Sequence, residues 1–373
     1  MRTRGRFEQE LADLEVPSRA PITVTHFHVR KAIDPSIRAL MPDPSPGAMT
    51  PARMAPGYVL PSDARRRQLQ DALDALLRAS YADGLAPPVH LRVGLVDLTG
   101  VRYHAPVFAG HWAWGGSAAL EAGSLAKILP LYALYQLRFD LDTTAAQQGI
   151  TTGKALLAFM KAEWKRQGLV DAPDVPALFT FAGRSGDPVV ARLRQVHDVH
   201  HNHVARNLIV MLGFPYIGSV ALQSGLFDPA HGGLWLNAAY NEPALTWTTS
   251  PFPKQHRHNA TALATATYFT LLAQGRLVNE ATSAEIRKVL GMRLCMGNGP
   301  LDGIRGLGGA VNPVANKCGL LKPFYHEGCH VIRRASGGRT LSYALAMLTK
   351  RPPNLDLKEL GRNIDALVDA ANP

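Results

Sequence analysis

The sequence contains no apolar stretch of the 18 or more residues that indicate a transmembrane helix. The best candidate, residues 128–137, is too short and is interrupted by Pro130 and Gln136. The first residues, MRTRGRFEQELADLE, are basic at the start but contain no apolar segment typical of a secretory signal. We therefore expect a cytoplasmic protein that does not associate with a membrane.

Cysteine and charge are also scarce. The three cysteines, Cys295, Cys318 and Cys329, form no C-x-x-C pair and no even-numbered framework, which argues against a zinc knuckle or a disulfide scaffold. Only 18% of residues are charged, yet 40 are basic and 29 acidic, giving a net charge of +11. The basic residues are scattered rather than interleaved with aromatics, so we expect a small anionic partner and no nucleic acid.

Hydrophobic residues make up 46% of the chain, enough to bury a substantial core. Residues 1–61 are rich in proline and arginine and read as an N-terminal extension. From residue 62 to 373 the pattern is that of a folded domain. Leucines at helical spacing open it, from Leu69 to Leu77, and an amphipathic helix from Leu357 to Val368 closes it.

Between these helices, two strand-like runs cover residues 90–98 and 101–108, and three more cover 314–321, 328–333 and 340–348. The long middle section, about 125–290, is mostly helical in pattern. Strands joined by turns rather than by crossover helices form antiparallel sheets. The order therefore predicts an α/β (α+β) fold in which helices from the chain ends cover one face of an antiparallel sheet and helices from the insert cover the other.

A possible catalytic pair lies in the segment EAGSLAKILPLYALYQL. A helix that begins near Gly123 places Ser124 and Lys127 one turn apart on the same face. A serine hydroxyl needs a base to act as a nucleophile, and a partly desolvated lysine at a helix start can lose its proton and serve as that base. The alternative is a serine that caps the helix beside a surface lysine.

A second triplet, Lys317-Cys318-Gly319, lies on a predicted strand late in the chain. The layout of S-x-x-K at Ser124 and this triplet resembles the serine β-lactamase and penicillin-binding protein superfamily, whose motifs are S-x-x-K, S-D-N and K-T-G. The class A β-lactamase branch is the most similar. The resemblance covers about residues 62–370 and implies a three-layer α-β-α sandwich with a five-stranded antiparallel sheet and an inserted all-helical subdomain.

Residues 201–213, HNHVARNLIVMLG, resemble the segment of this family that carries S-D-N. Matching Ala205, Asn207, Leu208 and Gly213 puts His201 where the family has its proton-shuttling serine and His203 at the substrate-binding asparagine. A shift of one residue puts Asn202 at the asparagine place instead. A histidine can pass a proton to a leaving group near neutral pH.

The resemblance assigns further roles. Lys317 would attract an anionic substrate, and Gly319 would let the substrate lie against the strand. Cys318 replaces the threonine of the family. The oxyanion would be held by the N–H groups of Ser124 and Leu320.

A further segment, residues 241–246 (NEPALT), resembles the E-P-x-L-N of the class A omega loop. By this match Glu242 would activate the water that deacylates the enzyme. The resemblance thus implies a serine hydrolase that acts on a small anionic amide or ester without any cofactor or metal.

Two other interpretations remain open. Because two motifs are altered, the chain could be a non-catalytic member of the fold that binds a ligand or a partner. Alternatively, His197-Asp198-Val-His-His201 has the spacing of the zinc motif H-E-x-x-H, with aspartate in place of glutamate. A zinc hydrolase would need a third ligand, such as His203, His256 or His258.

Overall fold

The computed structural model describes most of the residues that follow position 62. They are 63–79, 91–100, 107–110, 119–166, 169, 172–176, 202–228, 232–241, 245–248, 250, 256–291, 299–307, 312–322, 324–335, 337–350 and 356–373. The predicted extension, residues 1–61, lies outside them.

The chain divides into two compact units. Within the described residues, unit 1 comprises Lys127–Gln223 and Trp235–His258. Unit 2 comprises the chain up to Ala126, Ser224–Leu234 and Asn259–Pro373. Both units are therefore built from segments that are distant in sequence.

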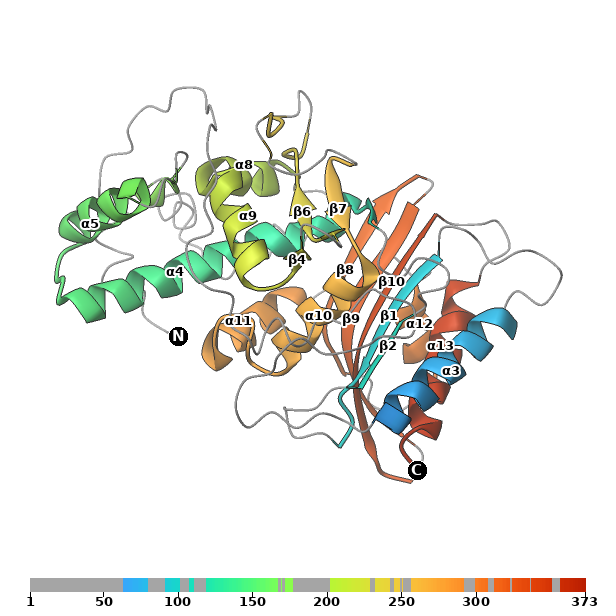
Figure 1. Cartoon of the computed structure of the whole chain (residues 1–373). Helices are drawn as coiled ribbons and strands as arrows, with labels where there is room; N and C mark the ends of the chain where they lie inside the picture. The colour runs from blue at the N-terminus through green and yellow to red at the C-terminus, as the bar shows by residue number, and fades with distance from the viewer. Residues whose placement is uncertain are drawn as a thin grey trace. The chain divides into compact units, whose positions relative to one another are not determined.

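Unit 2 contains a five-stranded antiparallel sheet in the order β2-β1-β10-β9-β8 (Figure 1). The strands are β1 (Leu91–Asp97), β2 (Val107–Gly110), β8 (Asn312–Leu321), β9 (Phe324–Arg334) and β10 (Thr340–Lys350). The predicted sheet is thus confirmed, with β9 several residues longer than its apolar run because polar side chains continue the pairing.

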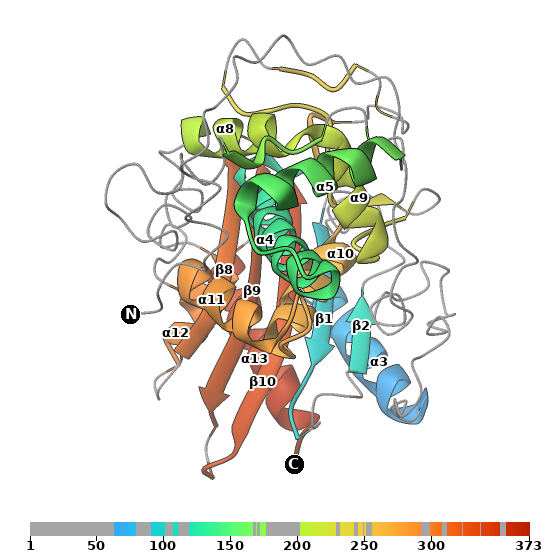
Figure 2. The same cartoon turned by 90° about the vertical axis from the view of Figure 1, so that its left-hand side faces the viewer.

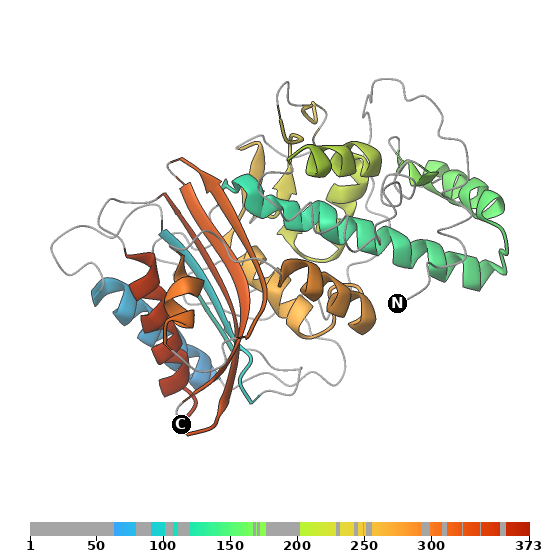
Figure 3. The same ribbon diagram turned by 180° about the vertical axis from the view of Figure 1, so that it is seen from behind.

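Helices cover both faces of this sheet, as Figures 1 and 3 show. One face carries α3 (Asp63–Ala79), α12 (Pro300–Arg305) and α13 (Leu357–Ala370), whose apolar side chains join those of β1, β9 and β10 in one buried cluster. The other face carries α10 (Ala262–Ala273), with α11 (Glu280–Leu290) beside it and against β8. The predicted three-layer α-β-α arrangement is therefore confirmed within unit 2.

Burial on both sides explains the composition of these elements. The leucines of α3 and α13 recur at helical spacing and face the sheet, whereas all twelve residues of α10 are buried. Glycines on the sheet let α10 approach closely: a Cβ on Gly94 would lie 2.6 Å from Ala262 O, and one on Gly328 would lie 2.5 Å from the Phe269 ring. Thr261 caps α10 by accepting the N–H of Ala264.

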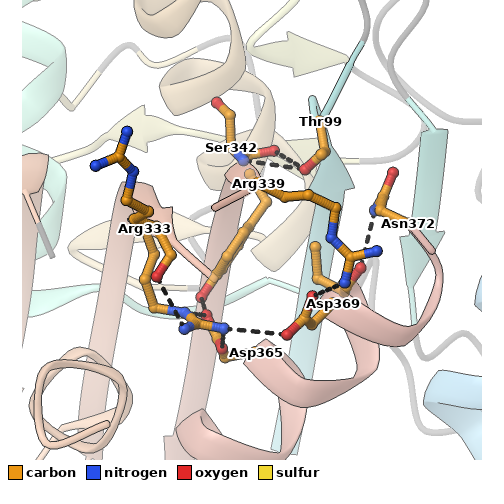
Figure 4. Close-up of polar contacts among 10 residues, drawn as sticks. Thr99, Arg333, Arg339, Ser342, Asp365, Asp369 and Asn372 are labelled. Carbon is orange, nitrogen blue, oxygen red and sulfur yellow. Dashed lines mark hydrogen bonds and ion pairs between the residues drawn. The ribbon is translucent and has the colours of Figure 1, made fainter. Parts of the chain in front are cut away.

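A buried polar network joins α13 to the sheet (Figure 4). Arg333 on β9 donates Nε–H to Asp365 Oδ1 at 2.9 Å and forms an ion pair with Asp365 Oδ2 at 2.6 Å. Tyr343 on β10 donates its hydroxyl to the same carboxylate at 2.8 Å. At the partly exposed side, Arg339 pairs with Asp369 at 2.9 Å. The network fixes the last helix against the two longest strands.

Unit 1 is built around the long helix α4 (Ile128–Gln148), which Figure 2 shows nearly end-on. The helices α5 (Gly153–Arg166), α8 (Asn202–Leu212) and α9 (Phe214–Gln223) pack against it. Unit 1 also contains a stack of aromatic rings, in which the centroid of Trp247 lies 5.2 Å from that of Trp235 and 5.8 Å from that of Phe214.

The insert is not entirely helical, which corrects the expectation of an all-helical subdomain. Short strands occur at β4 (Phe227–Asp228), β5 (Gly232–Gly233), β6 (Trp235–Leu236) and β7 (His258–Ala260). Strands of two or three residues are too short to produce a hydrophobic period, so the sequence pattern did not reveal them. Within the described residues no single helix is long and apolar enough to cross a membrane. Helices α8 and α9 reach that length and apolar composition only when taken together, and the two are bent by 86°.

Candidate active site

Ser124 lies directly after a sharp turn in unit 2. The short strand β3 (Leu120–Glu121) pairs with Ala260 and Asn259 of β7, and the chain then turns at Gly123, whose φ is 51°. This left-handed conformation suits glycine because it has no Cβ. The 3₁₀ helix η2 (Gly123–Lys127) follows, and Leu125 N–H donates to Ala122 O at 3.1 Å. Ser124 is 8% exposed.

The 3₁₀ geometry differs from the predicted α-helical start, but it serves the same pairing. In a 3₁₀ helix the side chains of residues i and i+3 eclipse one another. Ser124 and Lys127 are the second and the last residue of η2. The local backbone therefore sets both side chains on one face of the same turn.

The edge strand β8 approaches this turn in unit 2. A Cβ placed on Gly319 would collide with the carbonyl oxygen of Ala122 and lie 2.9 Å from Leu125 N. A Cβ on Gly123 would in turn lie 3.7 Å from Leu320 O. The structure thus brings the predicted triplet and the serine turn together, and Gly319 is the residue that allows backbone to approach backbone.

The residues of the triplet face opposite sides of the sheet. Side chains alternate along a strand, so Lys317 and Gly319 share the face on which the serine turn lies. Cys318 is paired with Glu327 of β9 and faces the other way. Lys317 is buried, and its ammonium donates to Cys318 O at 2.7 Å. Leu320 is half-buried.

Glu327 is a buried carboxyl that the sequence analysis did not single out. It accepts the N–H of Leu301 at 3.2 Å and bonds the side chain of Asn316 on β8. Burial raises the pKa of Glu327 from 4.5 to about 8. Between these values the folded protein holds a proton that the unfolded chain has released, so this group lowers stability as the pH rises through that window. An acidic residue next to the apolar run of β9 was the signal in the sequence that could have identified this buried carboxyl.

His326, the neighbour of Glu327, holds β3 in place from the other face. Its Nδ1 accepts the N–H of Thr349 at 3.1 Å, so Nε2 carries the proton and donates to Glu121 O at 2.8 Å. Burial lowers the pKa of His326 to about 4, which keeps the ring neutral near pH 7. Glu121 is three residues before Ser124, so His326 links the central sheet to the serine turn.

In unit 1, Lys127 is 1% exposed, and its Nζ donates to Asn202 Oδ1 at 2.6 Å. Asn202 is the first residue of α8, while the next residue, His203, is exposed. Of the two residues that the sequence offers for the asparagine place, Asn202 is thus the one with a hydrogen bond to Lys127. The Nζ atom also lies 5.0 Å from the centre of the Tyr240 ring, a contact that sequence reasoning missed.

Several predicted residues lie outside the described part of the chain. These are His201 and Glu242, together with His197 of the zinc alternative. Among the described residues no group of three His, Cys, Asp or Glu side chains could hold a metal ion. His258, one suggested third ligand, stacks on Tyr240 instead, with 4.3 Å between ring centroids.

Comparisons with known proteins give similarity in fold. No protein-family model and no curated protein matches the chain. Among solved structures, a β-lactamase from Sphaerobacter thermophilus is 16% identical, covering 81% of this chain and 97% of its own, with a TM-score of 0.49. PBP-A is 15% identical over 84% of this chain and 99% of its own, with a TM-score of 0.46.

A mutant of PBP-A in an acyl-enzyme complex with penicillin G is 14% identical, covering 85% of this chain and 100% of its own, with a TM-score of 0.49. These neighbours are thus a β-lactamase, PBP-A and a PBP-A mutant, all at low sequence identity and with TM-scores below 0.5.

Proposed function

We propose that the chain is a serine hydrolase of the β-lactamase and penicillin-binding type, which cleaves an amide or ester through an acyl-enzyme on Ser124. One observation carries the proposal: Lys127 follows Ser124 by three residues in a 3₁₀ turn, is buried, and is held by Asn202. A buried amine beside a serine is the arrangement that lets a lysine act as a general base.

In the proposed reaction, Lys127 Nζ takes the proton from Ser124 Oγ as the oxygen attacks the carbonyl carbon of the substrate. The C–N or C–O bond then breaks, and the leaving group takes a proton. The N–H groups of Ser124 and Leu320 are the candidate oxyanion donors. Lys317 is the candidate anchor for an anionic substrate, since it lies on the face of β8 that meets the serine turn.

The proton donor to the leaving group depends on the register of the second motif. The original match assigns it to His201, whereas the register in which Asn202 is the asparagine moves it one residue back, to His200. The variants His200→Ala and His201→Ala separate the two assignments, because the one that removes the donor slows acylation by amides more than by activated esters. Glu242→Gln tests deacylation in the same way, by lengthening the life of the adduct.

The test is intact-mass spectrometry after incubation with a panel of β-lactams and an activated fluorophosphonate. The wild type is expected to gain the mass of the acyl or phosphonyl group, Ser124→Ala to gain none, and Lys127→Ala to react far more slowly. An adduct that persists in Ser124→Ala, or a wild type that reacts with no probe, overturns the proposal.

A non-catalytic binding protein of the same fold is the second candidate. It is favoured by the contact of Lys317 with the carbonyl of its own neighbour, Cys318, because a lysine engaged in this way is a weaker anchor for a substrate. In that case β-lactams bind without forming an adduct, which equilibrium dialysis beside the mass measurement distinguishes.

A further inference from the structure

The buried side chain of Lys127 has two contacts in unit 1 that can stabilise its positive charge. An ammonium group taken out of water needs compensating contacts. One is the amide oxygen of Asn202, which accepts a hydrogen bond at 2.6 Å. Another is the face of Tyr240, whose ring centre lies 5.0 Å from Nζ, within the range of a cation–π contact.

The Tyr240 ring is itself held in place. It is 5% exposed and stacks on the imidazole of His258 with 13° between the planes. His258 is fixed in turn, because its Nε2 lies 3.1 Å from Ala238 O. The backbone on either side closes a loop: Ala238 and Thr246 form a β-bridge, and Ala239 N–H donates to Leu245 O at 2.7 Å.

From this arrangement we infer that Tyr240 is a positioning residue for Lys127, whose ring face holds the amine beside Asn202 and stabilises the positive charge formed when Lys127 takes the proton of Ser124. The inference rests on the proposed function. It adds a residue that none of the motifs contains and that lies more than a hundred residues further along the chain.

The physical effect follows from the ring quadrupole. The negative face of an aromatic ring favours a cation over a neutral amine, so it stabilises the protonated product of the proton transfer. On the helices packed against α4, α8 offers the neutral amide of Asn202 and also carries His203 and Arg206, whereas α9 contains no Asp, Glu, Lys, Arg or His. His258 lies behind the ring.

The experiment measures two quantities in the full chain: the rate of acylation of Ser124 by intact mass, and the pKa of Lys127 by NMR of ¹³Cε-labelled lysine. At a pH high enough for Lys127 to be neutral, Tyr240→Leu is expected to slow acylation by up to about tenfold, and it is expected to lower the pKa of Lys127 by about one unit. Tyr240→Phe keeps the ring face and is expected to restore both quantities to within about twofold and about 0.3 units.

A matched control removes a comparable contact elsewhere in unit 1. Tyr135 on α4 is buried, and the guanidinium carbon of Arg138 lies 4.9 Å from its ring centre. Tyr135→Leu is expected to lower Tm and to leave both the acylation rate and the pKa of Lys127 unchanged. In a Lys127→Ala background, Tyr240→Leu is expected to slow the residual acylation no further, because its effect passes through the lysine.

The outcomes separate the two proposals. A wild type that is not acylated at Ser124 overturns the proposed function and this role with it. A wild type that is acylated, while Tyr240→Leu keeps the wild-type rate and the wild-type pKa of Lys127, overturns the role of Tyr240 alone. Equal decreases of the acylation rate in Tyr240→Leu and Tyr135→Leu overturn this role as well, since they indicate general destabilisation of unit 1.

Discussion

The close approach of β8 to the serine turn leads to a sharp prediction for Gly319→Ala. The new Cβ would collide with Ala122 O and meet Leu125 N at 2.9 Å. Both neighbours are backbone atoms, so neither can rotate away. Non-bonded atoms of this kind rest about 3.5 Å apart, so the turn and β8 must separate by roughly 1 Å.

The magnitude follows from this displacement. Overpacking of this kind costs about 1–3 kcal/mol of stability. A misplacement of about 1 Å in a reacting group costs on the order of 10²-fold in rate. Gly319→Ala is therefore expected to fold, to lose several degrees in Tm, and to acylate Ser124 about a hundredfold more slowly than the wild type.

Gly94→Ala is the matched control, because its Cβ would also meet a backbone oxygen, that of Ala262, at 2.6 Å. Gly94 lies on β1, which is separated from β8 by β10 and β9. It should lose similar stability yet acylate at nearly the wild-type rate, as measured by intact mass over time. The reasoning is refuted by equal acylation rates in the two variants, or by a Gly319→Ala protein with the rate and Tm of the wild type.

Three further predictions concern stability and the serine turn. Asp365→Asn removes the nearer of the two carboxylates that pair with the buried Arg333, at 2.6 Å against 3.5 Å for Asp369, and should cost about 3 kcal/mol in denaturant unfolding. The more exposed Asp369→Asn should cost less than about 1 kcal/mol, and equal losses would contradict the network. Relative to Glu327→Gln, the wild type should lose up to about 1.4 kcal/mol of stability per pH unit between pH 5 and 8, and parallel curves would rule this out. Gly123→Ala and Gly149→Ala should each cost about 1 kcal/mol through left-handed strain, but only the former should slow acylation; if both do, the turn has no special role.

Much of the fold was readable because its signals are local or periodic. The amphipathic repeat of α13 and the apolar runs of β8 and β10 appear directly in the sequence, and each element formed where the pattern predicted it. Ser124 and Lys127 are likewise three residues apart, so their common face depends only on a turn of helix.

The rest of the candidate site depends on contacts between distant residues. The ring of Tyr240 reaches Lys127 across more than a hundred residues, and His326 reaches Glu121 across 205. No spacing rule encodes such contacts. The match of the second motif left Asn202 and His203 as alternatives for another reason: the sequence pattern does not show which of them contacts Lys127, and the fold gives that contact to Asn202.

The order of strands in the sheet has a consequence for how the protein is made. β1 pairs with β10, so Leu91 cannot pair with Thr349 until the ribosome has synthesised β10. Residues enter a growing chain at about 5–20 per second, which leaves β1 without that neighbour for roughly 10–50 s during synthesis. Closing so long a loop is slow, and an apolar strand with one edge left unpaired readily joins other strands. Production of this protein should therefore depend more on chaperones than its final stability alone indicates.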